Sequence, residues 1–331
     1  MRWAFVGIGR VTHRMVQAVR SAGHEVVLAA GRDPKKLRDW QDHFGVQHGT
    51  TDLNAACESE QVDAVYVALP PSLHAQYAIR AVESGKRVLC EKALTVSLDQ
   101  AEEIRQAVVR TKVPLVHATA FPHHPRSLAM RSVIESGELG EICRISVACS
   151  VGGILDRRDH RIDASAGGGC LLDLGWYCVY STLWFTGFRP SQIVSIGTHV
   201  ANEPSSVWYQ VQSMARLESS GKEYPKANRS LVASWDCGYE AMGRKWIEIA
   251  GTQASLICDD FLRPWDIEKP RFWVHGSDGK ARSEQAGVGI SQEAQLVRSL
   301  SSCTFEESLE ALSLAIETQS ILSRIDADLR R

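Results

Sequence analysis

The first third of the chain alternates short apolar runs with amphipathic stretches. The runs at residues 3–6 and 62–69 contain almost no polar side chain, which is typical of parallel strands covered on both faces. After the first run, Met15, Val16 and Val19 fall on one stripe of a helix. Further strands are predicted at 25–30, 87–90 and 113–117, and helices at 34–43, 73–84 and 97–110. Strands that alternate with helices predict a doubly wound parallel sheet.

After about residue 122 this alternation stops. A helix at 126–136, a strand at 142–151, an irregular polar segment at 156–169 and a helix at about 171–186 come first. Strand-like runs then follow one another at 192–200, 207–217, 230–237, 245–250 and 254–258, and helices near 291–302 and 305–328 finish the chain. Strands in succession predict a second, α+β domain with a largely antiparallel sheet and helices on one face. We place the boundary at residue 120.

Composition excludes several classes of protein. The 331 residues are 44% hydrophobic and 23% charged with a net charge of −2, so nothing favours nucleic acid or an anionic membrane. Nine scattered cysteines without C-x-x-C argue against a disulfide framework or a metal site, and predict a reducing compartment, the cytoplasm. The N-terminus shows no signal peptide. The apolar stretch from Cys170 to Phe188 is interrupted by Asp173 and two glycines, so we expect no membrane span.

A glycine-rich turn follows the first predicted strand. Gly7 allows the tight turn, and Gly9 lets the backbone approach a pyrophosphate that the next helix stabilises. The third position of the G-x-G-x-x-G fingerprint holds Thr12, so the motif is imperfect, and the alternative is a turn that binds nothing. We predict a dinucleotide on this loop, with contacts from Gly7, Ile8, Gly9, Arg10 and Val11.

The end of the second strand decides between NAD and NADP. An acid there holds the ribose hydroxyls of NAD, whereas an arginine meets the 2′-phosphate of NADP. The residues are Gly31, Arg32 and Asp33, and Asp33 is expected to cap the helix that begins at Pro34. Arg32 is then free to reach a phosphate. We therefore favour NADP, with NAD possible, and the alternative for Arg32 is a solvated surface charge.

Asp173 lies in an unusually apolar run that follows three glycines. It shares a helix face with Tyr177, four residues later. A buried carboxylate is costly unless it is paired. One interpretation is a core helix in which backbone or an arginine binds Asp173. The other pairs Asp173 with Lys92, at the end of a predicted strand, across the domain interface and beside the Tyr177 hydroxyl, as an acid/base device.

Four motifs, in this order and spacing, resemble one known family. They are V-A-L-P-P-S-L-H-A, A-V-E-S-G-K-R-V-L-C-E-K-A, E-S-G-E-L-G-E-I and G-G-G-C-L-L-D-L-G-W-Y-C, which begin at residues 67, 81, 135 and 167. The family is that of glucose–fructose oxidoreductase, inositol dehydrogenase and the rhizopine catabolism protein (Gfo/Idh/MocA), and the branch that includes dimeric dihydrodiol dehydrogenase and xylose dehydrogenases is the most similar.

The resemblance implies a Rossmann domain over 1–120 and a domain over 121–331 whose open-faced sheet binds substrate and builds a homodimer or homotetramer. It also implies NAD(P) and a carbinol or keto carbon on a sugar, cyclitol or related diol as substrates. The catalytic residues carried over are Lys92, Asp173 and Tyr177. The resemblance also implies cofactor contacts near the nicotinamide from Leu69, Pro70, His74, Glu91 and Lys92.

Three places depart from the family pattern. Ala93 replaces the proline of E-K-P. The run A-F-P-H-H-P makes His123 and its neighbour His124 either substrate ligands or polar residues beside a helix start. Arg161, in H-R-I-D, stands where relatives have W-R-x-D, so either a substrate or cofactor contact or a loop salt bridge fits.

The predicted mechanism is hydride transfer between nicotinamide and the substrate carbon. Tyr177 exchanges the carbinol proton, Lys92 lowers the pKa of Tyr177 or itself passes the proton, and Asp173 orients Lys92. Substrate contacts are expected from Lys92, His123, Arg161, Asp173 and Tyr177. Two alternatives stay open: a redox-silent nucleotide sensor, and a hydrolase or lyase that uses tightly bound NAD without net oxidation.

Overall fold

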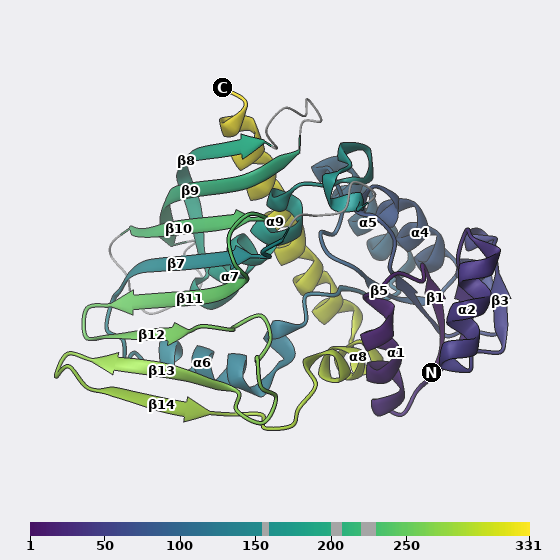
Figure 1. Ribbon diagram of the computed structural model, residues 1–331, viewed down its shortest axis with the longest axis horizontal. Helices are drawn as coiled ribbons and strands as arrows, with labels where there is room; N and C mark the ends of the chain where they lie inside the picture. The colour runs from purple at the N-terminus through teal and green to yellow at the C-terminus, as the bar shows by residue number, and fades with distance from the viewer. Residues whose placement is uncertain (154–158, 200–206, 220–229) are drawn as a thin grey trace. The chain divides into compact units, whose positions relative to one another are not determined.

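The computed structural model describes residues 1–153, 159–199, 207–219 and 230–331. Within them the chain forms two compact units, each built around one sheet (Figure 1). The first unit contains Met1–Ala120 and Ser291–Gln319, and the second contains Phe121–Ile290 and Ser320–Arg331. One sheet is parallel and the other mainly antiparallel, which confirms the predicted fold class.

Six parallel strands form the sheet of the first unit, in the order β3-β2-β1-β4-β5-β6. This order is that of a doubly wound Rossmann sheet, in which ligands bind at the carboxyl ends of the strands. The strands are β1 (Arg2–Val6), β2 (Glu25–Ala30), β3 (His48–Thr50), β4 (Ala64–Val67), β5 (Arg87–Cys90) and β6 (Leu115–His117). The helices between them are α1 (Thr12–Ser21), α2 (Pro34–Phe44), α3 (Leu53–Glu58), α4 (Pro71–Glu83) and α5 (Leu98–Thr111).

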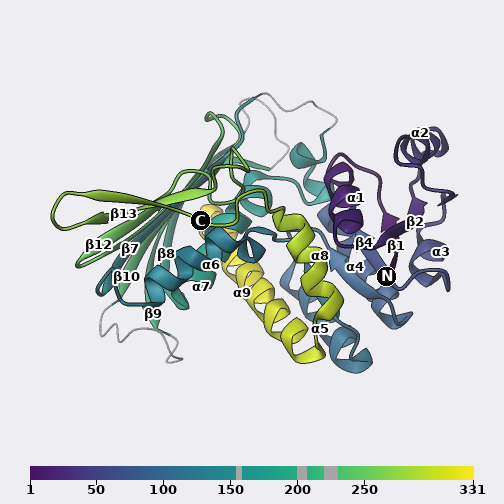
Figure 2. The same ribbon diagram turned by 90° about the horizontal axis from the view of Figure 1, so that it is seen from below.

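Two C-terminal segments complete this unit, which corrects the predicted second domain of 121–331. Helix α8 (Gln292–Ser302) packs against α1, and its Leu296, Val297 and Leu300 join the core of the first unit (Figure 2). Helix α9 (Phe305–Leu329) contributes Ser308, whose hydroxyl accepts from the Leu115 N–H at 2.9 Å and donates to its carbonyl at 2.8 Å. The hydroxyl thereby satisfies backbone groups on the edge strand β6. An apolar helix face does not show which of two cores it packs into. The sequence pattern therefore did not predict that residues 291–319 belong to the first unit.

Eight strands form the sheet of the second unit, in the order β14-β13-β12-β11-β7-β10-β9-β8. Among the strands of the described residues, β7 and β10 pair in parallel and the other neighbours pair antiparallel. The strands are β7 (Ile142–Ser150), β8 (Phe188–His199), β9 (Trp208–Ser219), β10 (Leu231–Gly238), β11 (Arg244–Gly251), β12 (Ala254–Cys258), β13 (Arg271–Gly276) and β14 (Ala281–Gln285). Of the predicted segments, residues 156–158 and Val200 lie outside the described residues.

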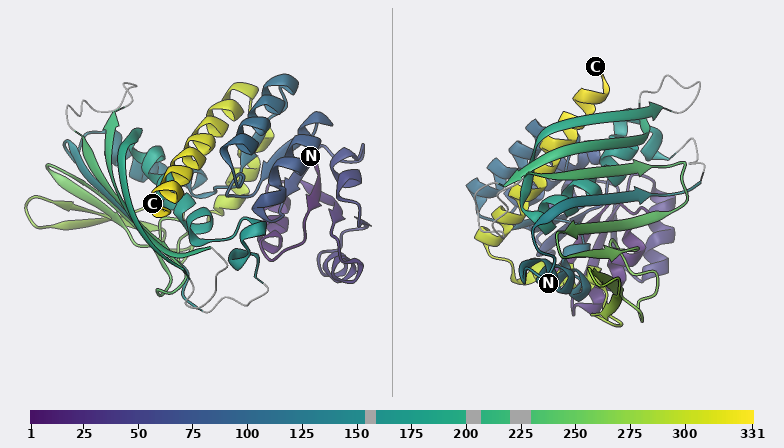
Figure 3. Two further views of the ribbon diagram at one scale, coloured as in Figure 1. Left: turned by 90° about the horizontal axis from the view of Figure 1, so that it is seen from above. Right: turned by 90° about the vertical axis from the view of Figure 1, so that its left-hand side faces the viewer.

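Helices cover one face of this sheet and leave the other uncovered. Helices α6 (Pro125–Glu135) and α7 (Trp176–Thr186) pack on the inner face, and within the described ranges no helix of this unit lies over the outer face (Figure 3). Strand register aligns Val194 of β8 with Met214 of β9 on that outer face. These two side chains are 59% and 61% exposed, and Ile196 is 76% exposed. The outer face is therefore partly apolar. No helix in the described part of the chain is long and apolar enough to cross a membrane.

Candidate functional site

The turn after β1 has the backbone geometry that a bound dinucleotide requires. Gly7 has a φ of +103°, and a Cβ there would lie 2.2 Å from the Ala68 carbonyl oxygen, so only glycine fits. A Cβ on Gly9 would meet no atom within 4 Å, so the chain is open to a ligand at this point. This part of the fingerprint therefore has the form that the sequence indicated.

The N-terminus of α1 also has donors to offer. No side chain caps this helix. Among the described residues, no hydrogen bond involves the backbone N–H groups of Gly9, Arg10 and Val11. Such groups, at the positive end of a helix dipole, bind phosphate oxygens well. The turn and the helix start thus fit the pyrophosphate of NAD(P).

Thr12 explains why the third fingerprint position is not glycine. Its side chain is fully buried, and its hydroxyl donates to the Gly9 carbonyl at 2.6 Å. The Thr12 hydroxyl oxygen in turn accepts the indole N–H of Trp40, on α2, at 2.9 Å. Thr12 therefore connects the glycine-rich turn to α2.

The end of β2 follows the predicted arrangement. The Asp33 carboxylate accepts the backbone N–H groups of Lys35 and Lys36 at 2.9 and 3.1 Å, which confirms it as the cap of α2. These bonds lower the pKa of Asp33. Gly31 packs beneath Ile8, since a Cβ on Gly31 would lie 2.7 Å from the Ile8 Cδ1 atom. Arg32 is exposed, and its guanidinium has no hydrogen bond or ion pair within the described residues.

His74 joins the loops that follow β4 and β5. Its imidazole is fully buried, with Nδ1 2.9 Å from the Ala93 carbonyl and Nε2 2.7 Å from the Leu69 carbonyl. Burial lowers the pKa of His74, and a neutral imidazole donates to only one of these two carbonyls. This placement favours a positioning role over the direct cofactor contact that the resemblance implied.

Lys92 is the second residue after β5, at the edge of the parallel sheet where ligands bind in this fold, and it is half-buried. The preceding carboxylate is fixed, because the Tyr66 hydroxyl donates to Glu91 Oε1 at 2.5 Å and the Lys92 backbone N–H lies 3.3 Å from Oε2. The Lys92–Ala93 peptide bond is cis. Pro70, three residues after the neighbouring strand β4, is the residue before α4.

In the second unit, the glycine run allows two segments to approach closely. A Cβ on Gly168 would lie 2.6 Å from the Arg161 carbonyl oxygen. Gly169, with a φ of +109°, donates its N–H to that same carbonyl at 2.7 Å. The chain then enters a π-helical turn at Leu171–Gly175 before α7 begins. The predicted helix over 171–186 is present, but its first five residues are wound more loosely, and Asp173 lies among them.

The Asp173 carboxylate accepts two donors on one oxygen. Arg161 Nε donates to Oδ2 at 3.0 Å, and the Tyr239 hydroxyl donates to the same atom at 3.2 Å. Arg161 Nη1 also donates to Asp159 Oδ2 at 3.0 Å. The structure thus provides the arginine partner that one sequence interpretation required, and the loop salt bridge that was one alternative for Arg161.

These charges determine the protonation states around Asp173. Burial, and then the negative charge of Asp173, raise the pKa of Tyr239 far above its ordinary value, so Tyr239 stays a neutral donor. Burial lowers the pKa of Arg161, but Asp173 and Asp159 outweigh that effect and raise it overall. Tyr177 is half-buried, at the second position of α7.

The two neighbouring histidines have different surroundings. His124 Nδ1 accepts the Arg126 backbone N–H at 3.0 Å, so His124 caps α6, as the helix-start alternative supposed. Burial lowers the pKa of His123 to about 4, and burial with the Arg126 charge lowers that of His124 to about 4. His123 is half-buried, and its role as a substrate ligand stays a prediction.

Two family models match this chain. The model described as an oxidoreductase family with an NAD-binding Rossmann fold matches residues 1–119, and the GFO/IDH/MocA C-terminal domain model matches residues 127–257. The chain belongs to the GFO/IDH/MocA family. It is an NAD(P)-dependent oxidoreductase, and the resemblance found in the sequence motifs is confirmed.

Individual relatives agree with the family. An uncharacterized oxidoreductase of Rhizobium meliloti is 31% identical over 268 residues, which cover 80% of this chain and 76% of the relative. A D-xylose 1-dehydrogenase (NADP(+)) of Haloferax volcanii is 30% identical over 65% of this chain and 66% of its own length. The crystal structure of a 3-ketoreductase from Actinomadura kijaniata, in complex with NADP and TDP-benzene, has the same fold, with a TM-score of 0.85 and 23% identity over 99% of this chain and 97% of its own.

Sequence reasoning missed the partners of Glu91 and Asp173, which belong to two of the family motifs. Tyr66, on β4, binds Glu91, and Tyr239, after β10, binds Asp173. Tyr239 belongs to the run D-C-G-Y-E, which carries no motif, and it lies 66 residues from Asp173. Only the fold of the second unit reveals this pairing.

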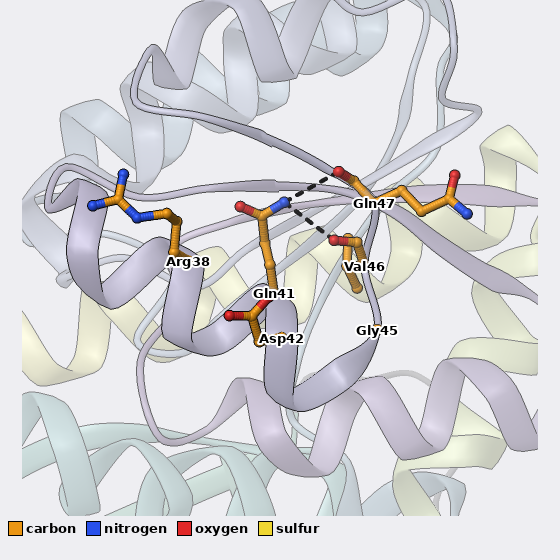
Figure 4. Close-up of a pocket in the computed structure, with 6 residues that line it drawn as sticks. All are labelled: Arg38, Gln41, Asp42, Gly45, Val46 and Gln47. Atoms are coloured by element: carbon orange, nitrogen blue, oxygen red, sulfur yellow. Dashed lines mark hydrogen bonds between the residues drawn. The ribbon is translucent and has the colours of Figure 1, made fainter.

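A shallow pocket of about 380 Å³ lies elsewhere in the first unit (Figure 4). It is lined by Arg38, Gln41, Asp42, Gly45, Val46 and Gln47, and the Gln41 amide donates to the Val46 carbonyl at 3.1 Å. The pocket lies at the C-terminal end of α2, whereas Arg32 precedes its N-terminal end. It is therefore separate from the dinucleotide fingerprint.

Proposed function

We propose that this GFO/IDH/MocA protein transfers a hydride between NADP and a carbinol or keto carbon of a sugar, cyclitol or related diol. Lys92, Asp173 and Tyr177 are its catalytic residues. The observation that carries the proposal is the fixed Asp173 carboxylate, which Arg161 and Tyr239 hold four residues before Tyr177. A half-buried acid with charge partners, four residues before a tyrosine along the chain, is the kind of cluster that acid/base catalysis uses.

The three side chains divide the proton chemistry. Bound nicotinamide accepts or supplies the hydride. As the substrate is oxidised, its C–H bond gives up the hydride and its hydroxyl gives a proton to Tyr177, and reduction reverses both transfers. The pKa of a free tyrosine is about 10, so Tyr177 needs a nearby cation, which Lys92 provides. Asp173 balances the charge of Lys92 and orients its ammonium group.

NADP is the proposed coenzyme, with NAD as the alternative. Exposed Arg32 supports NADP, because an arginine after the second strand suits a 2′-phosphate and Asp33 is engaged as a helix cap. The Haloferax relative carries NADP(+) in its name, and the Actinomadura enzyme was crystallised with NADP. The pyrophosphate contacts fall to Gly7, Ile8, Gly9, Arg10 and Val11, and Gly31, Leu69 and Pro70 are proposed to line the rest of the cofactor site.

The outer face of the eight-stranded sheet is proposed to form a homodimer or homotetramer. Val194, Ile196 and Met214 expose apolar surface there, and contiguous apolar patches of this kind favour protein contacts. We further propose that the protein works in the cytoplasm and that it needs neither a metal nor nucleic acid.

The test is net oxidation of a small molecule by the purified protein. We expect aldoses, cyclitols or cyclic diols to raise the near-ultraviolet absorbance of reduced nicotinamide, with NADP preferred to NAD. A redox-silent sensor, or a hydrolase that recycles tightly bound NAD, binds nucleotide but gives no such change with any member of the panel. That result, obtained with nucleotide bound, would contradict the proposed reaction.

A further inference from the structure

We propose that Tyr239 is a positioning residue for the reaction: its hydroxyl, together with the Arg161 guanidinium, holds the Asp173 carboxylate in its working orientation. This inference rests on the proposed function of Asp173. Tyr239 does not itself touch the reacting atoms in this account, and it acts through the carboxylate.

The position of Tyr239 is set by the sheet. Its backbone N–H donates to the Tyr209 carbonyl at 3.0 Å, which continues the pairing of β10 with β9 by one residue. Its ring meets the Tyr209 ring edge to face, with 5.4 Å between the centroids, and its side chain is fully buried. A buried aromatic ring on a strand end offers a hydroxyl at a nearly fixed point in space.

Arg161 is a less rigid partner. It comes from a short helical turn, its side chain is 30% exposed, and its guanidinium is divided between Asp159 and Asp173. Two carboxylates therefore share one cation, each through a different nitrogen. Tyr239 gives Asp173 a second donor that Asp159 does not share in the described structure. Arg161 supplies a positive charge to the Asp173 carboxylate, and Tyr239 fixes the direction in which that carboxylate points.

The groups that face Asp173 define what a pH measurement reports. Arg161, from the turn before the glycines, and Tyr239, from the end of β10, bind Asp173, while Asp159 shares Arg161. In the proposed function the Lys92 ammonium also faces this carboxylate, and Tyr177 follows it by four residues. Cys170, a further titratable group, lies close enough to influence Tyr239. A hydrogen bond to the charged form of a carboxyl lowers its pKa, so removal of the Tyr239 hydroxyl moves protonation of Asp173 to higher pH.

The experiment compares Tyr239→Phe with Tyr209→Phe in the full chain. Tyr209→Phe is the matched control, because it removes the hydroxyl of the neighbouring ring, which is not bonded to Asp173 in the described structure. We expect Tyr239→Phe to lower kcat about tenfold, the effect of one hydrogen bond to a charged group, with little change in KM. We also expect the acid limb of its pH–rate profile to move to higher pH, while Tyr209→Phe matches the wild type in both measurements.

Asp173→Asn separates this inference from the proposed function. In that background we expect Tyr239→Phe to change the residual kcat less than about twofold, since coupled residues are not additive. A full tenfold loss in the Asn background, a wild-type acid limb in Tyr239→Phe, or failure of Tyr239→Phe alone to fold would overturn the positioning role. Full turnover of Asp173→Asn by itself would instead contradict the proposed function, whatever Tyr239 does.

Discussion

The residues after β2 show how the role of Asp33 as a helix cap bears on the role of its neighbour Arg32. The Asp33 carboxylate accepts hydrogen bonds from the first N–H groups of α2. These bonds lower the pKa of Asp33, so the carboxylate stays charged. Both bonds fall on Oδ1, and we propose that this carboxylate serves the helix and not the ribose hydroxyls of NAD. In the proposed function, Arg32, exposed beside it, is the group that distinguishes the two coenzymes.

Arg32→Ala should weaken NADP binding and leave NAD binding nearly unchanged. Hydrogen bonds from a charged group to phosphate contribute about 1.5–3 kcal/mol, so the Kd for NADP should rise about 10- to 100-fold. Calorimetric titration with each nucleotide measures this. Arg38→Ala, also exposed but one turn into α2, serves as the control. Equal effects of Arg32→Ala on both nucleotides would refute the assignment.

His124 gives the second unit a pH-dependent stability. Burial and Arg126 lower its pKa to about 4 from an ordinary value of 6.5, and His123 has a similarly lowered pKa. Between these values the unfolded chain binds protons that the folded chain does not. The free energy of unfolding should therefore fall as pH drops from about 6.5 to about 4, and level off above 6.5.

His124→Asn should make this decline shallower. Asparagine still caps α6 but does not titrate, whereas His124→Ala also loses the cap and about 1 kcal/mol at neutral pH. Denaturant unfolding at several pH values measures both effects, with the exposed His275→Asn as the control for loss of an imidazole. An unchanged slope in His124→Asn would show that other groups cause the decline.

Single residues were predictable where the cause is local. The Asp33 cap and the Gly7 turn depend on neighbours within a few positions, or on a conformation that only glycine adopts readily. The partners of Glu91 and Asp173 depend on strand pairing, and Tyr66 and Tyr239 carry no local sign of their role. The arginine on Asp173 was anticipated as a type of partner, but the sequence did not identify which arginine.

At the scale of elements, burial explains part of what the sequence pattern found, although β13 (Arg271–Gly276) was missed despite its buried Phe272 and Val274. Strands β2 and β5 have the predicted bounds, because each is a mostly apolar run inside the sheet. Strand β3 has three largely exposed residues, and β14 is mainly exposed, so neither shows an apolar pattern. The π turn at Leu171–Gly175 was also beyond reach, since its apolar spacing is close to that of an α-helix.

Thr12 links two elements of the cofactor-binding half, and Thr12→Val tests that link. Valine keeps the shape but leaves the indole N–H of Trp40 buried without an acceptor, which should cost about 1–3 kcal/mol of unfolding free energy. Loss of the bond to Gly9 should also weaken nucleotide binding. Thr51→Val, at an exposed position in the same unit, is expected to stay within about 0.5 kcal/mol. Equal unfolding curves for the two variants would contradict this role.

At the scale of the whole molecule, the chain order of the two units was only partly predictable. The division after Ala120 coincides with the change from alternating to successive strands. The return of residues 291–319 to the first unit depends on contacts such as those of Leu296 and Ser308, which join segments nearly 200 residues or more apart. The open face of the second sheet came from the family resemblance, because the alternation along β8 and β9 does not say what covers the exposed side.

Met214→Arg should break the proposed oligomer at this open face. A charge at the centre of an apolar interface is strongly unfavourable, so light scattering should give a smaller mass than for the wild type. Val109→Arg places the same change on the exposed surface of α5 and should leave the mass unchanged. A wild-type mass for Met214→Arg would exclude this face as the interface.

The central claim is that Lys92, Asp173 and Tyr177 serve one proton-coupled hydride transfer, and turnover of Lys92→Ala and Tyr177→Phe tests it most directly. We predict that each variant loses about 10²- to 10⁴-fold in kcat, the range for loss of an acid/base group, while its Kd for NADP stays close to that of the wild type. Lys280→Ala and Tyr77→Phe, both outside the proposed site, should turn over normally. Wild-type kcat in either Lys92→Ala or Tyr177→Phe would contradict the account.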